Sequence, residues 1–153
     1  GPTMLIGGHA LVTGQLPRTA PFEEGSPNQL ALIDGQWQHA PWIHDDQAIV
    51  INVKSKGLVV LTGCGHAGVV NTLKCARELT GVSQIHAVIG GFHLTGPLFE
   101  PIIQPTVQAL KEFNPGVIVP QHCTGWKATH LIAREFASAF VPNSVGTTMV
   151  IGA

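Results

Sequence analysis

Three apolar segments of this chain each run directly into a turn that carries a histidine, and this repetition constrains the fold more than any other feature. The turns contain His66, His93 and His122. The apolar segments span residues 58–62, 87–89 and 117–119. Continuous apolar runs of this kind are typical of strands that are buried on both faces. Because ligands gather at the carboxyl ends of strands in α/β sheets, we expect the three imidazoles to converge on one point.

The glycines around these histidines favour a site rather than ordinary turns. Three glycines flank His66, and Gly90-Gly91 precedes His93. Glycine permits positive φ and a close backbone approach, which a sharp turn needs in order to aim a side chain inward. Imidazole suits transition metals, and three protein ligands with an open position make a catalytic rather than a structural site. Taken singly, each histidine is better explained as a turn residue that is hydrogen-bonded to the backbone. Three histidines in equivalent positions favour a shared metal site instead.

The elements between these turns alternate strands and helices, so the expected fold class is α/β (α+β layered). We predict strands over residues 48–53, 58–62, 86–89 and 117–119, with short closing strands at 140–141 and 148–151. Apolar periodicity predicts helices over residues 69–79, 102–113 and 126–136. Gly81 and Asn114 suit the ends of the first two helices, and Thr124 suits the N-cap of the third.

Residues 14–46 differ from the rest of the chain because they are rich in turn formers and lack a periodic pattern. We expect an extended loop with one hairpin at Asp34-Gly35. The 153 residues suit a single domain over residues 3–153. Gly1-Pro2 has the form of a remnant left by protease cleavage of an expression tag.

Composition excludes several classes of function. Only 11% of residues are charged and the net charge is −1, so no basic field is available to bind nucleic acid or an anionic membrane. No apolar run approaches the length that a membrane span requires. The three cysteines form no CxxC pair, which predicts free thiols in a reducing compartment and a cytoplasmic location. The expected ligand is a small-molecule substrate.

Three motifs closely resemble the metallo-β-lactamase superfamily, and in particular its branch of 7,8-dihydropterin-6-methyl-4-(β-D-ribofuranosyl)aminobenzene-5′-phosphate synthase-like proteins. They read TGCGHAGVVN from Thr62, VIGGFHL from Val88 and PQHCTG from Pro120. The resemblance implies an αββα sandwich with a mono- or dinuclear metal site at one edge. It implies that His66 and His122 bind a divalent transition metal, which we expect to be zinc, with iron or manganese as alternatives. His93 stands where the superfamily often has a bridging aspartate, so it is either a metal ligand or a catalytic proton-transfer group.

The chain departs from the family in one large respect, because the HxHxDH motif of the N-terminal half is absent. The resemblance therefore implies the C-terminal half of an αββα metallo-β-lactamase sandwich. The missing half could be a separate chain or could have been removed, the segment could have been expressed alone on purpose, or a second copy could replace the missing layer. We accordingly expect an N-terminal half or a homo-oligomer partner.

Other residues near the histidine motifs suggest secondary roles. The N–H groups at Thr124-Gly125 and at Gly68 could bind a phosphate or carboxylate, although ordinary capping explains them equally well. Cys64 and Cys123 are expected either beside the metal ligands without binding the metal, or as small buried hydrophobic residues. A Cys–His nucleophile is disfavoured, since His122 and Cys123 should point apart on an extended segment.

The leading hypothesis is a C-terminal segment of a metal-dependent hydrolase that cleaves a phosphoryl or acyl ester with metal-activated water. As an isolated chain it should bind metal weakly and hydrolyse little. The alternative is a non-catalytic half-sandwich that pairs with a partner chain or a second copy. A cysteine-dependent enzyme is the third hypothesis.

Overall fold

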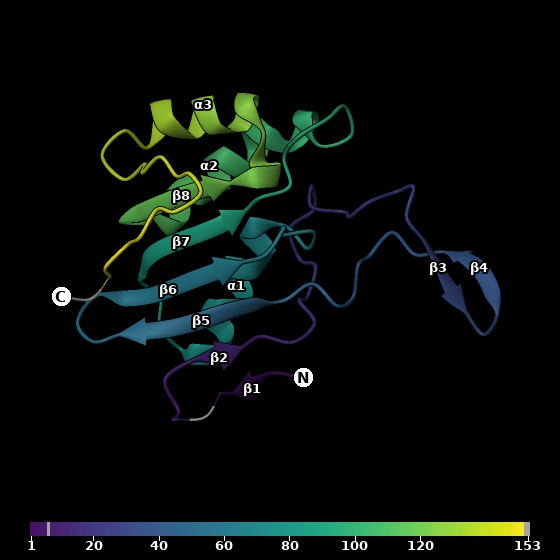
Figure 1. Cartoon of the computed structure of the whole chain (residues 1–153), viewed down its shortest axis with the longest axis horizontal. Coiled ribbons are helices and arrows are strands. Elements are labelled where there is room, and N and C mark those ends of the chain that lie inside the picture. The colour runs from purple at the N-terminus through teal and green to yellow at the C-terminus, as the bar shows by residue number, and fades with distance from the viewer. Residues whose placement is uncertain (6, 152–153) are drawn as a thin grey trace.

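A six-stranded mixed sheet forms the centre of the computed structural model, which describes residues 1–5 and 7–151 (Figure 1). The sheet order is β1-β2-β5-β6-β7-β8. Its strands are β1 (Thr3–Met4), β2 (Leu11–Val12), β5 (Ala48–Val53), β6 (Gly57–Thr62), β7 (Ile85–Gly91) and β8 (Val117–Gln121). This arrangement confirms the mixed α/β class and the four longer strands predicted from the sequence.

Strand directions place the predicted site at one edge of this sheet. β6, β7 and β8 pair in parallel, whereas β5 pairs with β6 in antiparallel fashion. The carboxyl ends of the three parallel strands therefore share an edge with the start of β5. Ala48, the first residue of β5, pairs with Thr62, the last residue of β6.

Three helices share one hydrophobic core with the sheet. They are α1 (Val69–Thr80), α2 (Ile103–Phe113), which follows the 3-10 helix η1 (Glu100–Ile102), and α3 (Trp126–Glu135). Gly81 and Asn114 adopt left-handed conformations at the ends of α1 and α2, as the sequence predicts. Leu58, Val60 and Val88 contribute the sheet side of the core and are fully buried.

The predictions for the N-cap of α3 and for the closing strands are wrong. Thr124 does not cap α3, because it lies in the 3-10 helix η2 (His122–Thr124) and its hydroxyl accepts the N–H of Phe92. Gly125 occupies the N-cap position instead. The prediction of two closing strands is also wrong. Phe140 forms a single parallel bridge with Ile118, and residues 148–151 form no strand. The short edge strands β1 and β2 were not predicted.

The segment over residues 14–46 is extended, as expected, and carries the predicted hairpin. Its strands β3 (Leu30–Ile33) and β4 (Gln36–His39) flank Asp34-Gly35 and extend away from the main sheet (Figure 1). Asn71 of α1 anchors the same segment, because its Oδ1 accepts the N–H groups of Thr19 and Ala20. This segment therefore forms a wall beside the carboxyl ends of the parallel strands.

The C-terminal segment crosses the sheet on the side opposite α1 (Figure 1, yellow). Met149 and Ile151 line a cavity there of about 400 Å³ together with Val59, Leu61 and Ile89. No helix within residues 1–5 and 7–151 is long and apolar enough to cross a membrane.

Candidate metal centre at the sheet edge

His66 and His93 meet at the carboxyl ends of β6 and β7. Their ring centroids lie 4.6 Å apart with an interplanar angle of 69°. Phe99 contacts the His93 ring at a centroid distance of 4.5 Å. Among the described residues, the buried Nδ1 of His93 has no hydrogen-bond partner. Burial, together with the neighbouring His66, lowers the pKa of His93, which favours its neutral, metal-binding form.

The backbone at these turns brings the two histidines together. Gly65 has φ +71°, and a Cβ there would collide with the carbonyl oxygen of Gly91. The N–H of Gly91 donates to the carbonyl oxygen of Gly63 at 2.9 Å, which joins the ends of β6 and β7. His93 itself has φ +48°, a left-handed conformation that is uncommon outside glycine.

Two residues of the loop support His66 and were missed by sequence reasoning. Asp46 Oδ1 lies 3.9 Å from His66 Nδ1, and Asp46 Oδ2 accepts the N–H of Ala67 at 2.7 Å. Arg18 donates from Nη1 to the carbonyl oxygen of His66 at 3.0 Å. Asp46 could have been found, since it precedes β5 and the antiparallel pairing with β6 places it beside the His66 turn. No feature of the sequence indicated that Arg18 would contact the His66 turn.

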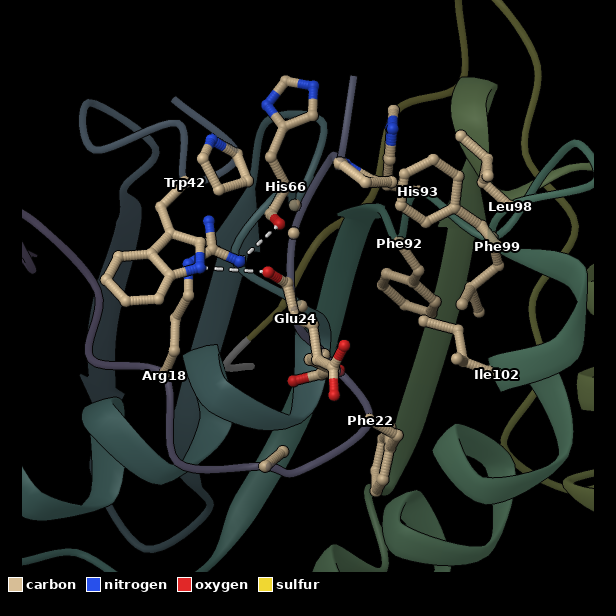
Figure 2. Close-up of a pocket in the computed structure, with 18 of the residues that line it drawn as sticks. Arg18, Phe22, Glu24, Trp42, His66, Phe92, His93, Leu98, Phe99 and Ile102 are labelled. Atoms are coloured by element: carbon tan, nitrogen blue, oxygen red, sulfur yellow. Dashed lines mark hydrogen bonds between the residues drawn. The ribbon is translucent and has the colours of Figure 1, made fainter. Parts of the chain in front are cut away.

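A cavity of about 590 Å³ opens beside His66 and His93 (Figure 2). Its volume lies within the range that small-molecule sites occupy. Figure 2 shows the indole of Trp42 and the guanidinium of Arg18 opposite the apolar side chains of Leu98 and Phe99. The cavity therefore combines aromatic walls with a cation, two imidazoles and the carboxyl groups of Glu23 and Glu24.

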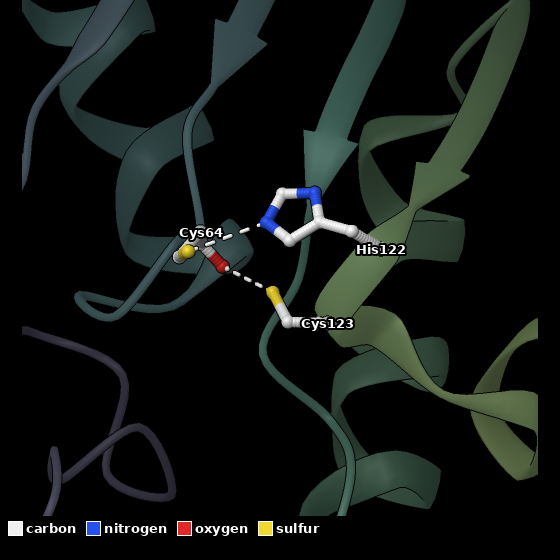
Figure 3. Close-up of side chains that lie close together, drawn as sticks. All are labelled: Cys64, His122 and Cys123. Carbon is white, nitrogen blue, oxygen red and sulfur yellow. Dashed lines mark hydrogen bonds between the residues drawn. The ribbon is translucent and has the colours of Figure 1, made fainter. Parts of the chain in front are cut away.

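His122 follows β8 at the same edge and lies among thiols. Its Nε2 is 3.2 Å from the Sγ of Cys64, and the Cys123 thiol donates to the carbonyl oxygen of Cys64 at 3.1 Å (Figure 3). His122 also lies close enough to His93 to affect its charge state. The expectation that His122 and Cys123 point apart is wrong, because both lie in η2 rather than on an extended segment.

Two of the three cysteines, Cys75 and Cys123, do not have the properties of a nucleophile. Burial raises the pKa of the Cys123 thiol to about 11 and also raises the pKa of Cys75. Because the thiolate is the reactive form, a thiol held protonated at neutral pH is a poor nucleophile. Cys123 and Cys75 are therefore poor candidates for the nucleophile of a cysteine-dependent enzyme.

The predicted anion site at Gly68 holds a carboxylate of the chain itself. Glu23 accepts the N–H groups of Val70 and Asn71 at 3.0 and 2.8 Å, and it fills the space that a side chain at position 68 would need. At the other candidate, the Thr124 hydroxyl is engaged by Phe92. Gly125 opens α3 without a side-chain cap, so anion binding there stays a prediction.

The donor groups at this edge fit a transition metal. Nδ1 of His93, which has no partner within residues 1–5 and 7–151, supplies an imidazole nitrogen beside the His66 ring. The Cys64, His122 and Cys123 ligand atoms lie within 4.8 Å of one another. Imidazole and thiolate are ligands that zinc and its neighbours prefer over magnesium or calcium. The assignment of His66, His93 and His122 as the ligands stays a prediction.

Known proteins resemble this chain in sequence and in structure. No protein-family model matches it. The 7,8-dihydropterin-6-methyl-4-(β-D-ribofuranosyl)-aminobenzene-5′-phosphate synthase of Methanocaldococcus jannaschii is 38% identical over 98 residues, which are 64% of this chain and 33% of the synthase. An uncharacterised protein of the same organism is 30% identical over 118 residues, or 77% of this chain and 41% of that protein.

A solved structure matches nearly the whole chain. It is the crystal structure of Tm1679, a metal-dependent hydrolase of the β-lactamase superfamily, with a TM-score of 0.81 and 29% identity over 97% of this chain and 56% of that one. The chain thus spans a third to two fifths of the curated relatives and about half of the solved one. These matches confirm the resemblance to the synthase branch and to the β-lactamase superfamily of metal-dependent hydrolases.

Proposed function

We propose that this chain is part of a metal-dependent hydrolase in which His66, His93 and His122 hold a divalent transition metal, most simply zinc. The observation that carries the proposal is the pairing of the His66 and His93 rings at 4.6 Å, with a buried His93 Nδ1 that has no hydrogen-bond partner among the described residues. When bound, such a metal lowers the pKa of water and polarises an ester oxygen.

The residues around the histidines have distinct roles in this proposal. Asp46 positions the turn that carries His66 by accepting the N–H of Ala67, and its other oxygen lies 3.9 Å from His66 Nδ1, so Nε2 of that ring is the nitrogen assigned to the metal. His93 presents Nδ1, and Phe99 fixes the orientation of its ring. Further ligands come from outside this chain, which is consistent with its covering only part of each relative.

The proposed substrate is a small molecule that joins a planar ring to a phosphoryl or acyl ester. The name of the methanogen relative describes a dihydropterin, an aminobenzene and a 5′-phosphate. The 590 Å³ cavity has Trp42 and Phe99 on opposite walls, Arg18 on one side and the histidine pair at its end. Aromatic walls suit a planar ring, and a guanidinium suits a phosphoryl group.

Phenylphosphonate tests this proposal, because it joins a ring to a phosphoryl group through a bond that water does not cleave. We expect the chain to bind phenylphosphonate at least about 10-fold more tightly with zinc than without it, as one charge-assisted metal contact predicts. Calorimetric titration measures the difference. The double variant His66→Ala/His93→Ala should lose the zinc effect, whereas Lys127→Ala, which removes a surface ion pair with Glu100, should keep it. Equal binding with and without zinc would refute the proposal.

A further inference from the structure

The side chain of His122 belongs to a cluster that differs from the His66–His93 pair. Cys64 follows β6, and His122 and Cys123 lie in η2 after β8, so the cluster spans β7 at the sheet edge (Figure 3). Cys64 Sγ, His122 Nε2 and Cys123 Sγ lie within 4.8 Å of one another. His66 and His93 line the 590 Å³ cavity, whereas His122 lines a separate cavity of about 990 Å³ between α3 and the segment over residues 140–145.

Gly91 makes this cluster possible. A Cβ at this position would lie 2.5 Å from the Sγ of Cys123 and 2.8 Å from Cε1 of His122. Gly91 does not have the positive φ that often explains a glycine. Its missing side chain therefore provides space for the thiol and the imidazole to approach Cys64.

The spacing of the three ligand atoms matches tetrahedral coordination of a thiophilic metal. Zinc–sulfur bonds of about 2.3 Å and zinc–nitrogen bonds of about 2.0 Å place tetrahedral ligands roughly 3.5 to 3.8 Å apart. Cys64 Sγ and His122 Nε2 are already 3.2 Å apart, and Cys123 is held in place by its bond to the Cys64 carbonyl.

We propose that Cys64, His122 and Cys123 form a Cys2His site for a thiophilic divalent cation such as Zn²⁺. As the two sulfur–metal bonds form, each thiol releases its proton to solvent, and neutral His122 binds through Nε2. Three protein ligands leave the fourth position to water or a small ligand. This site shares His122 with the proposed function but does not depend on His66 or His93.

Cobalt titration of the whole chain under reducing conditions tests the proposal, since thiolate ligation of Co²⁺ produces a sulfur-to-cobalt charge-transfer band. We expect a band that saturates at one equivalent. Cys64→Ser and Cys123→Ser should each remove the band and weaken Co²⁺ binding by at least about 100-fold, more than loss of an outer-shell partner costs. Cys75→Ser is the matched control, because Cys75 is a buried thiol of α1 outside the cluster. It should keep the band.

Two further measurements keep the result unambiguous. The band should persist in His66→Ala/His93→Ala, so that failure of the hydrolase proposal and failure of this one are distinguishable. In the unsubstituted chain, zinc should protect Cys64 and Cys123 from alkylation, as measured by mass spectrometry of the peptides. Absence of the band from the parent chain, its survival in both cluster variants, or alkylation unaffected by zinc would overturn the proposal.

Discussion

His93 combines a strained backbone with an unused ring nitrogen. Its φ of +48° is a conformation that costs a non-glycine residue roughly 1 kcal/mol. Its buried Nδ1 forms no hydrogen bond to any described residue. Residues held in such conformations are concentrated at functional sites, where the surrounding structure imposes them.

Substitution of His93 should separate backbone strain from ligand chemistry. We expect His93→Gly to exceed His93→Ala in free energy of unfolding by about 1 kcal/mol, because glycine adopts positive φ without penalty. Urea unfolding of the two variants measures the difference. Equal stabilities would show that the left-handed conformation does not persist in solution.

Asp46 should influence metal binding through His66. Asp46→Asn keeps an oxygen that can accept the N–H of Ala67 but removes the charge beside His66 Nδ1. We expect zinc affinity to fall by about 10-fold, the lower end of the effect of outer-shell partners. Competition with a chromophoric chelator measures it. Asp45→Asn, which changes an exposed neighbour, should leave the affinity unchanged.

At the scale of elements, the N-terminus of α1 is capped from a distant part of the chain. Glu23 lies 47 residues before Val70, whose N–H it accepts. Burial raises the pKa of Glu23 to about 7, although the two N–H bonds and the nearby Lys74 and Arg18 oppose the shift. The loop over residues 14–46 is therefore held to α1 by a carboxyl group that titrates near neutrality.

This cap predicts a pH dependence of stability. The folded state raises the pKa of Glu23 to about 7, whereas the unfolded chain loses this proton near the ordinary glutamate pKa of 4.5. The unfolded state thus binds fewer protons between these pH values, and stability should fall as pH rises through this window. A shift of this size corresponds to about 3 kcal/mol at most. In Glu23→Gln, urea unfolding should show a smaller loss between pH 4.5 and 7; an unchanged slope would rule out Glu23 as its source.

Sequence periodicity predicted the longer strands and helices correctly but did not predict the shortest strands. Apolar runs and helical spacing predicted β5 to β8 and α1 to α3, because burial of a face imposes a pattern on such segments. β1 and β2 have two residues each, too few for any period. Residues 148–151 are as apolar as a strand, but they cross the face of the sheet instead of extending its edge.

For the whole molecule, sheet topology explains why part of the site was predictable. Three parallel strands end at one edge, so histidines in equivalent turns had to lie near one another. The sequence could not predict which histidines contact one another. His66 pairs with His93, whereas the His122 ring contacts the Cys64 thiol, because η2 replaces the expected extended segment. The contributions of Arg18 and Asp46 depend on the path of the loop, which carries no periodic signal.

The partner expected to complete the site stays a prediction. The sheet face opposite α1 is covered, within residues 1–5 and 7–151, by the C-terminal segment, and Ile49 on β5 is 37% exposed. The chain also spans 56% of the solved superfamily member. The partial coverage is compatible with ligands from outside this chain, whereas the covered sheet face gives no support for a partner layer there.

The central claim is that the three histidines after β6, β7 and β8 bind metal together. Zinc stoichiometry at equilibrium dialysis, measured by elemental analysis of the chain, of His66→Ala/His93→Ala and of the triple variant His66→Ala/His93→Ala/His122→Ala, tests it most directly. We predict that the double variant binds less zinc than the parent, and that the triple variant binds none because its two remaining thiols lack their imidazole partner. The same stoichiometry in the parent and the double variant would contradict the claim.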